Sequence, residues 1–268
     1  SLNRWQASGL HLVLSALIAL TLILLVVAIW YPAPYFTAMG GATLLRLLIG
    51  IDVVLGPLIT LIIFDPKKPR LKFDLAAIGA LQVAALAAGA FIMFEARPVY
   101  AVFTSDRFEV VPANSIDRAS MVRAKAGFQS LPLGGPLVVG AHQPTDARER
   151  ADITMSAAMG GPDIAHLPHL YHAYDEVAVD AGRRARPLSQ LARRSAVDAL
   201  QVRGYLDTSG RAEGSVGYLP VRARNESVTS RSCGTRSAGS GIESTAARYS
   251  AQAYRSCLTR NSRATSAH

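Results

Sequence analysis

The sequence predicts a membrane α-helical protein with three transmembrane helices, a small periplasmic α+β domain and a disordered C-terminal tail. Three observations predict this fold. Residues 1–97 are dominated by Leu, Ile, Val and Ala, and three apolar runs within them are each long enough to cross a bilayer, which takes about 20 residues. A short basic loop separates the second run from the third and orients the helices. Residues 98–225 have the varied composition of a folded domain, whereas residues 226–268 are mostly polar.

The first apolar run covers about residues 9–31, and His11 is its only ionisable side chain. At 1.5 Å per residue it reaches about 34 Å, enough to span the hydrocarbon core. A cleaved signal peptide is the alternative, but its apolar core would cover about 7–15 residues and end in small side chains. This run ends in Trp30 and Tyr31, with Tyr35 close behind, which is typical of a membrane interface. We therefore favour a retained span.

The second run, about residues 40–64, contains Arg46 and Asp52. A charge inside a span costs roughly 2.5–3.5 kcal/mol on insertion scales, so each needs a partner or a function. Six residues of helix turn the chain by about 240° net, so the two side chains do not share a face. We expect a neighbouring helix to hydrogen-bond Asp52 and Arg46 to extend toward the outer interface. The alternative is that this polar site receives another membrane helix.

Gly56 and Pro57 follow within the same run. Proline removes an amide donor and clashes with the preceding turn, which predicts a kink at this point. The carbonyl groups exposed by a kink can open a groove for a partner, although proline is also tolerated in spans for purely structural reasons. We favour the structural role and keep both residues as candidate partner contacts.

The third run covers about residues 75–94 and is rich in Ala and Gly, which suits close helix packing in a membrane. The loop before it carries an excess of positive charge, whereas residues 32–39 between the first two runs contain no Lys or Arg. Such an excess marks the cytoplasmic side. The N-terminus is then cytoplasmic and the domain after Arg97 is outside, which in a bacterium with two membranes is the periplasm. The topology-determining residues are Lys67, Lys68, Arg70 and Lys72.

The outer domain mixes strand and helix signals, which predicts a small α+β fold. Two β-rich runs, 99–103 and 108–111, are joined by a plausible hairpin turn. We predict helices at about 114–126, 145–159 and 188–202, with Thr145 capping the second, and further strands at 135–140 and 216–222.

The formal net charge is +9, but it does not indicate nucleic-acid binding. The tail alone, with six Arg and two Glu, supplies +4 of it, and much of the rest lies in the orienting loop. No nucleic-acid-binding pattern is present. The tail has few large apolar residues and no periodicity, so it cannot offset the entropy of ordering. Its cysteines, Cys233 and Cys257, match no metal motif, although a disulfide could form on an oxidising side.

Three histidines, His166, His169 and His172, lie near Asp163 and Asp175 and raise the question of a metal site. Their spacing matches no known ligand pattern, and a proline interrupts the segment, so we interpret them as surface histidines and expect no metal. The sequence contains no nucleophile elbow, P-loop or paired-carboxylate pattern. We therefore expect neither catalysis nor a cofactor.

Several segments together resemble the TfpX/TfpZ family of type IV pilin accessory proteins, over about residues 3–225. They are SGLHLVLSALIAL, WYPAPYF, GIDVVLGPLITLIIFDPKKPRLKFDL, EARPVYAVFTSDRFEVV, FQSLPLGGP and AAMGGPDIA. The resemblance implies a non-catalytic, chaperone-like protein of the inner membrane that supports the stability or assembly of the type IV major pilin. The implied partners are that pilin, other pilus-assembly proteins and the lipid bilayer.

Type IV pilins bring an apolar N-terminal helix with a glutamate near its start, and a buried acid of this kind needs a donor. Arg46 would suit that role, with Asp52, Gly56 and Pro57 beside it. At the junction with the outer domain, Arg97 and Tyr100 complete the candidate partner contacts. The rival functions are a membrane-bound enzyme that modifies pilin and a sensor or transporter subunit. The tail departs from the family pattern, which continues with an apolar strand, and resembles a frameshifted reading of the gene.

Overall fold

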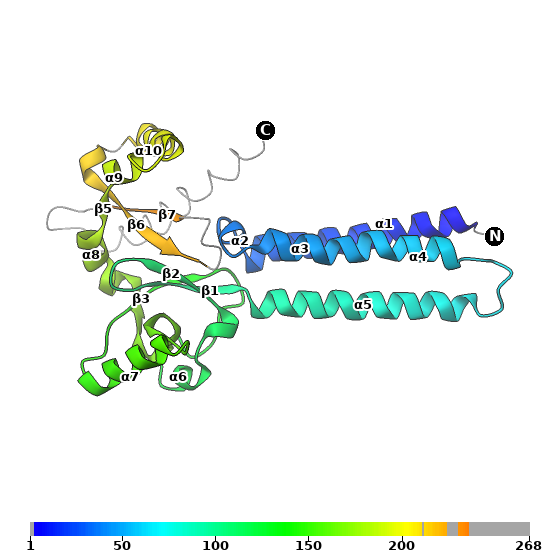
Figure 1. Ribbon diagram of the computed structural model, residues 1–268, viewed down its shortest axis with the longest axis horizontal. Coiled ribbons are helices and arrows are strands. Elements are labelled where there is room, and N and C mark those ends of the chain that lie inside the picture. The colour runs from blue at the N-terminus through cyan, green and yellow to red at the C-terminus, as the bar shows by residue number, and fades with distance from the viewer. Residues whose placement is uncertain (1–2, 211, 224–229, 236–268) are drawn as a thin grey trace.

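The computed structural model consists of a long helical stalk and a head built on a β-sheet (Figure 1). It describes residues 3–210, 212–223 and 230–235, the last of these by backbone only. The N-terminus lies at the end of the stalk far from the head. Three helices are long and apolar enough to cross a membrane, as predicted, and they comprise 27, 23 and 25 residues.

The first span consists of α1 (Arg4–Leu25) and a π-helical continuation, η1 (Val26–Trp30). It begins before residue 9 because Asn3 caps it: the Asn3 side chain accepts from the Gln6 amide, and Gln6 reciprocates in a capping box. A short helix, α2 (Tyr35–Ala38), follows at the head end of the stalk.

The second span has three parts: α3 (Gly41–Gly50), a π-helical turn η2 (Ile51–Leu55) and α4 (Gly56–Ile63). Gly40, with φ of 72°, makes the left-handed turn that starts it. The third span is the single helix α5 (Leu71–Glu95).

The stalk is held together mainly through the second span. The α1 helix packs along α4, and α5 packs on α3 and α4. Close approach at Gly89 of α5 depends on the missing side chain, since a Cβ there would lie 2.4 Å from Cδ1 of Leu48. In α5 itself only Met93 is buried among the described residues, so most of its surface is available to lipid or to another protein.

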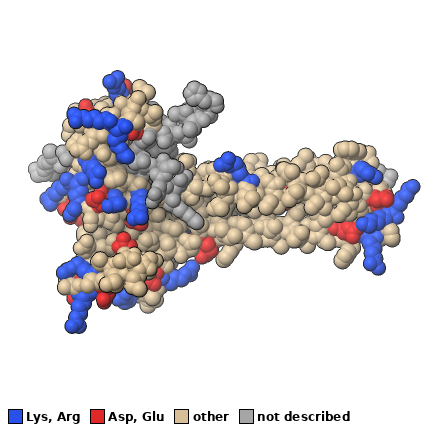
Figure 2. Space-filling model, in the orientation of Figure 1, with Lys and Arg blue, Asp and Glu red and all other residues tan. Residues whose placement is uncertain are grey.

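Figure 2 shows the stalk as almost uncharged between its two ends, with basic side chains concentrated at the end far from the head. This end is the turn between α4 and α5, which contains Lys67, Lys68 and Arg70, while Lys72 lies in the first turn of α5. Lys68 forms an ion pair there with Asp74 in the first turn of α5. The basic residues on which the predicted orientation depends therefore lie together at one end of the folded stalk.

The head contains a seven-stranded mixed sheet with the order β4-β3-β1-β2-β6-β5, and β7 also pairs with β6. Pairs β1–β2, β3–β4, β5–β6 and β6–β7 are antiparallel, whereas β1–β3 and β2–β6 are parallel. The strands are β1 (Pro98–Phe103), β2 (Phe108–Pro112), β3 (Leu137–Ala141), β4 (Tyr171–Ala173), β5 (Arg186–Pro187), β6 (Val216–Arg222) and β7 (Ser230–Thr235). The predicted hairpin and the strands predicted at 135–140 and 216–222 are confirmed.

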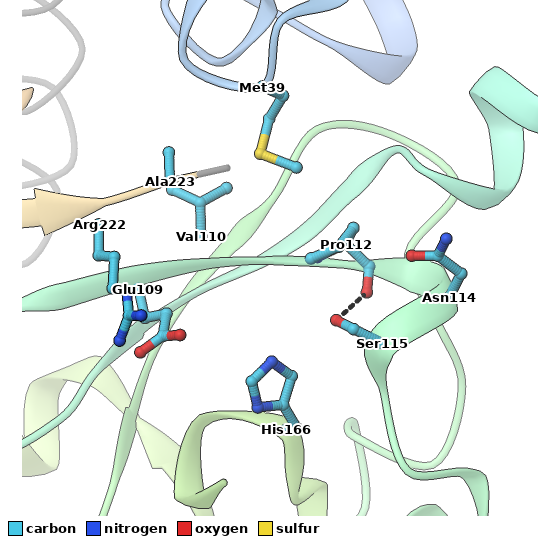
Figure 3. Close-up of a pocket in the computed structure, with 9 residues that line it drawn as sticks. All are labelled: Met39, Glu109, Val110, Pro112, Asn114, Ser115, His166, Arg222 and Ala223. Carbon is cyan, nitrogen blue, oxygen red and sulfur yellow. Dashed lines mark hydrogen bonds between the residues drawn. The ribbon is translucent and has the colours of Figure 1, made fainter. Parts of the chain in front are cut away.

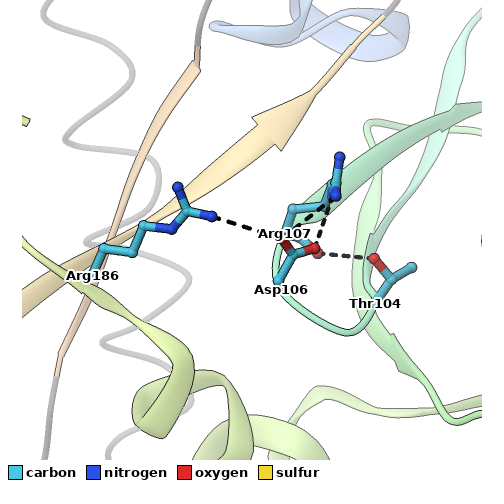
Figure 4. Close-up of polar contacts among 4 residues, drawn as sticks. All are labelled: Thr104, Asp106, Arg107 and Arg186. Atoms are coloured by element: carbon cyan, nitrogen blue, oxygen red, sulfur yellow. Dashed lines mark hydrogen bonds and ion pairs between the residues drawn. The ribbon is translucent and has the colours of Figure 1, made fainter. Parts of the chain in front are cut away.

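The turn of the β1–β2 hairpin is fixed by Asp106 (Figure 4). Its carboxylate accepts from Arg107 Nε at 2.8 Å and lies 3.7 Å from an Nη atom of Arg186 in β5. The hydrogen bond to Asp106 is the main reason that the pKa of Arg107 is raised. Thr104 closes the turn by donating from its hydroxyl to the Arg107 carbonyl at 3.3 Å. One carboxylate thus connects the hairpin to the distant strand β5.

Helices and 3-10 turns cover the sheet. They are η3 (Ala113–Ser115), α6 (Arg118–Val122), α7 (Ala147–Ala158), η4 (Ile164–His166), η5 (Pro168–Leu170), α8 (Tyr174–Arg184), α9 (Leu188–Ala192), α10 (Ala196–Ser209) and η6 (Glu213–Ser215). The helix predicted at 114–126 is shorter, and that at 188–202 is two helices. The caps of α6 and α7 are Asp117 and Asp146, because their carboxylates accept the amides of the first turn, so Thr145 is not a cap.

Residues 230–235 fall within the segment predicted to be disordered, and they differ from that expectation by forming β7 along β6. The remainder of that segment, including Cys257, lies outside the described residues, as does the side chain of Cys233.

Candidate partner-binding site

Asp52 lies in η2, halfway along the second span, and is only 7% exposed. Gln82 of α5 points at it: Nε2 donates to the Asp52 carboxylate at 3.1 Å and to the Asp52 backbone carbonyl at 3.2 Å. The expectation that a neighbouring helix hydrogen-bonds Asp52 is therefore confirmed. The other atom of the Gln82 amide, Oε1, is buried and has no hydrogen-bond partner among the described residues.

Gly56 makes this contact possible. A Cβ at Gly56 would lie 1.9 Å from Nε2 of Gln82, so any side chain would displace the amide. The kink predicted at Gly56 and Pro57 stays a prediction. Pro57 follows in the first turn of α4, and a π-helical turn, η2, lies directly before both residues. Such a turn accommodates the missing proline amide. Both residues are buried and serve the packing of the stalk.

A second polar contact joins α1 to α4 near the N-terminal end of the stalk. Ser8 donates from its hydroxyl to the Pro57 carbonyl at 2.8 Å, and Nδ1 of His11 lies 2.6 Å from the Thr60 hydroxyl. The prediction did not include these residues. The available signal was the spacing of Ser8, His11 and Ser15, which places three polar side chains on one face of an otherwise apolar helix.

Arg46 is the one candidate contact of the predicted six that is exposed. Its Nε donates to the Ala42 carbonyl of its own helix at 3.1 Å, and no described carboxylate forms an ion pair with it. It does not pair with Asp52, as the helix geometry predicts. One turn farther along the same exposed face, a Cβ at Gly50 would meet nothing within 4 Å. A cation and an open glycine thus lie together on the exposed side of α3.

Arg97, at the junction between stalk and head, is only 3% exposed. Nη1 donates to the Phe94 carbonyl at 2.7 Å, while Nε and Nη2 donate to the Pro132 carbonyl at 3.3 and 3.1 Å. The guanidinium carbon lies 3.8 Å from the centre of the Phe94 ring, a cation–π contact. Burial lowers the pKa of Arg97, and nearby Glu95 partly opposes that shift. Arg97 therefore anchors the loop at residue 132 to the end of α5.

Tyr100 is fully buried in the sheet. Its hydroxyl donates to the Ser130 carbonyl at 3.2 Å, and its ring packs edge-on against Tyr171, with centroids 5.0 Å apart. Burial raises the pKa of both tyrosines. In this structure Tyr100, like Arg97, has an internal role instead of presenting a contact surface.

The predicted histidine segment is split between two polar clusters. His169 lies between Ser120, whose hydroxyl is 2.6 Å from Nδ1, and Glu149, 3.0 Å from Nε2. His172 lies between Lys125 and Glu176, and its hydrogen bond lowers the pKa of Glu176. Among the described residues no group of three or more His, Cys, Asp or Glu could hold a metal ion.

The Ser120–His169–Glu149 arrangement has the residue types of a hydrolase triad, but its geometry does not suit that chemistry. Ser120 is 0% exposed, and its hydroxyl also accepts the His169 amide at 3.1 Å. A nucleophile must reach its substrate, and this hydroxyl instead connects α6 to η5. We interpret the cluster as a structural contact.

An open hollow of about 570 Å³ lies between the head and the connection between the first and second spans (Figure 3). Met39, at the end of α2, lies on one side, and His166 points into the hollow from the opposite side. Glu109 and Arg222 lie side by side along its edge, on the paired strands β2 and β6. An occupant would contact the head and the stalk together, through both polar and apolar side chains. The lining is completed by Val110, Pro112, Asn114, Ser115 and Ala223.

Comparison with known proteins gives consistent matches. Residues 2–40 match the family described as "Fimbrial assembly protein FimB". The chain is 36% identical over 188 residues to "Fimbrial assembly protein, serogroup I" of Dichelobacter nodosus, covering 69% of this chain and 72% of that protein. It is 39% identical over 114 residues to "Fimbrial assembly protein, serogroups C1 and C2" of the same organism, covering 41% and 86%. No solved structure matches.

Proposed function

The chain belongs to the family of fimbrial assembly proteins, and from this premise we propose that it is a non-catalytic accessory protein that binds the type IV major pilin in the inner membrane. Binding would keep the apolar pilin helix sheltered before or during assembly, while the head contacts the rest of the pilin or other assembly proteins. The narrower resemblance to TfpX/TfpZ accessory proteins stays a prediction. The buried state of Ser120 gives no support to the rival pilin-modifying enzyme.

The proposed orientation places the N-terminus and the basic turn in the cytosol and the head in the periplasm. It is supported by the basic residues at the far end of the stalk, since such residues are retained on the cytoplasmic side. Protease added to spheroplasts should therefore degrade the head and leave the loop of residues 67–72 intact, as followed with antibody tags at each place. Cleavage in that loop, with an intact head, would show the opposite orientation.

The exposed position of Arg46 is the observation that carries the proposal of pilin binding. Arg46 lies about 8 Å along the axis from the start of α3, within the apolar surface of a span. A cation at this depth is costly unless it snorkels or meets an opposite charge. The carboxylate of an apolar pilin helix would supply that charge, and Gly50 would allow the two backbones to approach closely.

Replacing Arg46 with leucine should lower the recovery of pilin with the tagged protein by about tenfold or more, which corresponds to about 1.4 kcal/mol. Arg46→Lys should keep most of the recovery because it retains the charge. Leu47→Ala changes the adjacent side chain, which is 65% exposed, and serves as the matched control. Equal recovery with Arg46→Leu and with the unmodified chain, at equal protein levels, would contradict pilin binding at this site.

A further inference from the structure

A second hollow, of about 390 Å³, lies on the head beside the stalk. It is lined by Arg118, Met121, Val122 and Gln129, which belong to α6 and the loop that follows it. The lining therefore combines a guanidinium and an amide with two apolar side chains. Val122 is 81% exposed.

An ion pair and the position of α6 place this hollow at the level where the stalk leaves the membrane. Arg118 forms an ion pair through Nη2, at 3.7 Å, with Glu95, the last residue of α5. In Figure 1, α6 lies on the side of the head next to α5. The start of α6 is therefore held at the end of a span, which is where phospholipid headgroups lie.

The adjoining loop lies against the end of the first span and the residue Pro32 just after it, at the same level. A Cβ at Gly135 would lie 2.3 Å from the Pro32 ring, and one at Gly134 would lie 3.9 Å from the Ile29 carbonyl. Leu133, directly before these glycines, is 70% exposed. Exposed apolar side chains together with a cation, at the end of a span, are typical of segments that rest in the membrane interface.

We propose that the hollow binds the headgroup of an anionic phospholipid from the leaflet on the side of the head. Arg118 and Gln129 donate hydrogen bonds to the phosphate oxygens, and Met121 and Val122 pack against the first carbons of the acyl chains. Arg118 is suited to this role because its side chain is 71% exposed and makes no hydrogen bond to another described residue. Its ion pair with Glu95 is exposed and weak, so the remaining guanidinium donors can bind phosphate.

Native mass spectrometry of the full chain in detergent tests the proposal. After removal of native lipid, the protein is titrated with phosphatidylglycerol, with a neutral glycolipid of equal chain length, or with inorganic phosphate. We expect phosphatidylglycerol to bind, with an affinity that Arg118→Gln and Val122→Ser each lower about fivefold or more. Arg148→Gln, on the exposed start of α7, loses the same charge and should bind like the unmodified chain.

Three results would overturn the proposal: equal affinity for the glycolipid, displacement of the lipid by millimolar inorganic phosphate, or unchanged binding by Arg118→Gln. Thermal melting of each variant checks that the head remains folded. If Arg118→Gln fails to fold, Val122→Ser decides the outcome, because it keeps the ion pair with Glu95. None of these measurements involves pilin, so the result does not depend on the proposed function.

Discussion

Replacing Arg97 with methionine should destabilise the head by about 2 kcal/mol and loosen the loop around residue 132. The substitution leaves the Pro132 carbonyl without its side-chain donors, and the Phe94 carbonyl keeps only the backbone amide of residue 97. A buried acceptor without a partner costs about 1–3 kcal/mol. Removing a buried cation recovers some desolvation energy, so the net loss is smaller than the sum of the lost contacts. Denaturant titration gives the stability, and hydrogen exchange at residues 128–136 reports the loop.

Arg123→Met is the matched control, because Arg123 is exposed directly after α6. It should leave the free energy of unfolding within about 0.5 kcal/mol of that of the unmodified chain. The exchange rates of the loop should stay the same. If Arg97→Met keeps the loop fully protected, Arg97 does not hold the loop to α5, and its burial needs another explanation.

Replacing Gly56 with alanine should destabilise the stalk by about 1–2 kcal/mol. The new Cβ would lie 1.9 Å from Nε2 of Gln82 and would push the amide away from Asp52. Hydrogen bonds between membrane helices contribute about 0.6–1.7 kcal/mol each, and Asp52 would lose both that it receives from Gln82. Unfolding of the purified protein by a denaturing detergent measures the change.

Gly50→Ala and Gly79→Ala are the controls, since a Cβ at either position meets nothing within 4 Å. Both should be neutral or slightly stabilising, because alanine favours a helix by up to about 1 kcal/mol over glycine. In a Gln82→Ala background, Gly56→Ala should cost nothing further. If Gly56→Ala destabilised the Gln82→Ala protein by as much as the unmodified chain, its effect would not act through Gln82.

The spans could be predicted from the sequence because the length and apolarity of a segment determine whether it can cross a membrane. The hydrogen bond to Asp52 could also be expected, because a charged side chain within an apolar span needs a partner. Its donor, Gln82, could not be identified, because it lies 30 residues away and only the packing of α5 brings it close.

In the head, the four predicted strands are present, but β4, β5 and β7 were not predicted. Thr145 has the right chemistry for a cap, but Asp146 is adjacent and its carboxylate is the stronger acceptor. The helix predicted at 188–202 is divided because Ser195 caps a new helix, α10. Helix α8 was missed, although the buried pair Val177 and Ala181 has helical spacing.

The candidate site was predicted least well. The sequence shows that a charged residue or a proline is unusual within an apolar span. It does not show whether the partner of that residue lies in the same chain or in another protein. Asp52, Gly56, Pro57, Arg97 and Tyr100 all have internal partners or packing roles in this structure, and the exposed Arg46 is left as the candidate for an external one.

The π-helical turn at Ile51–Leu55 makes the length of the second span as important as its composition. The part before the turn contacts α5 through Leu48, and the part after it contacts α5 through Gly56 and α1 through Thr60. Loss of one residue within the turn would rotate everything beyond it by about 100°. Thr60 would then swing away from His11. Evolutionary drift in this segment should therefore proceed by substitution, with insertions and deletions confined to the loops.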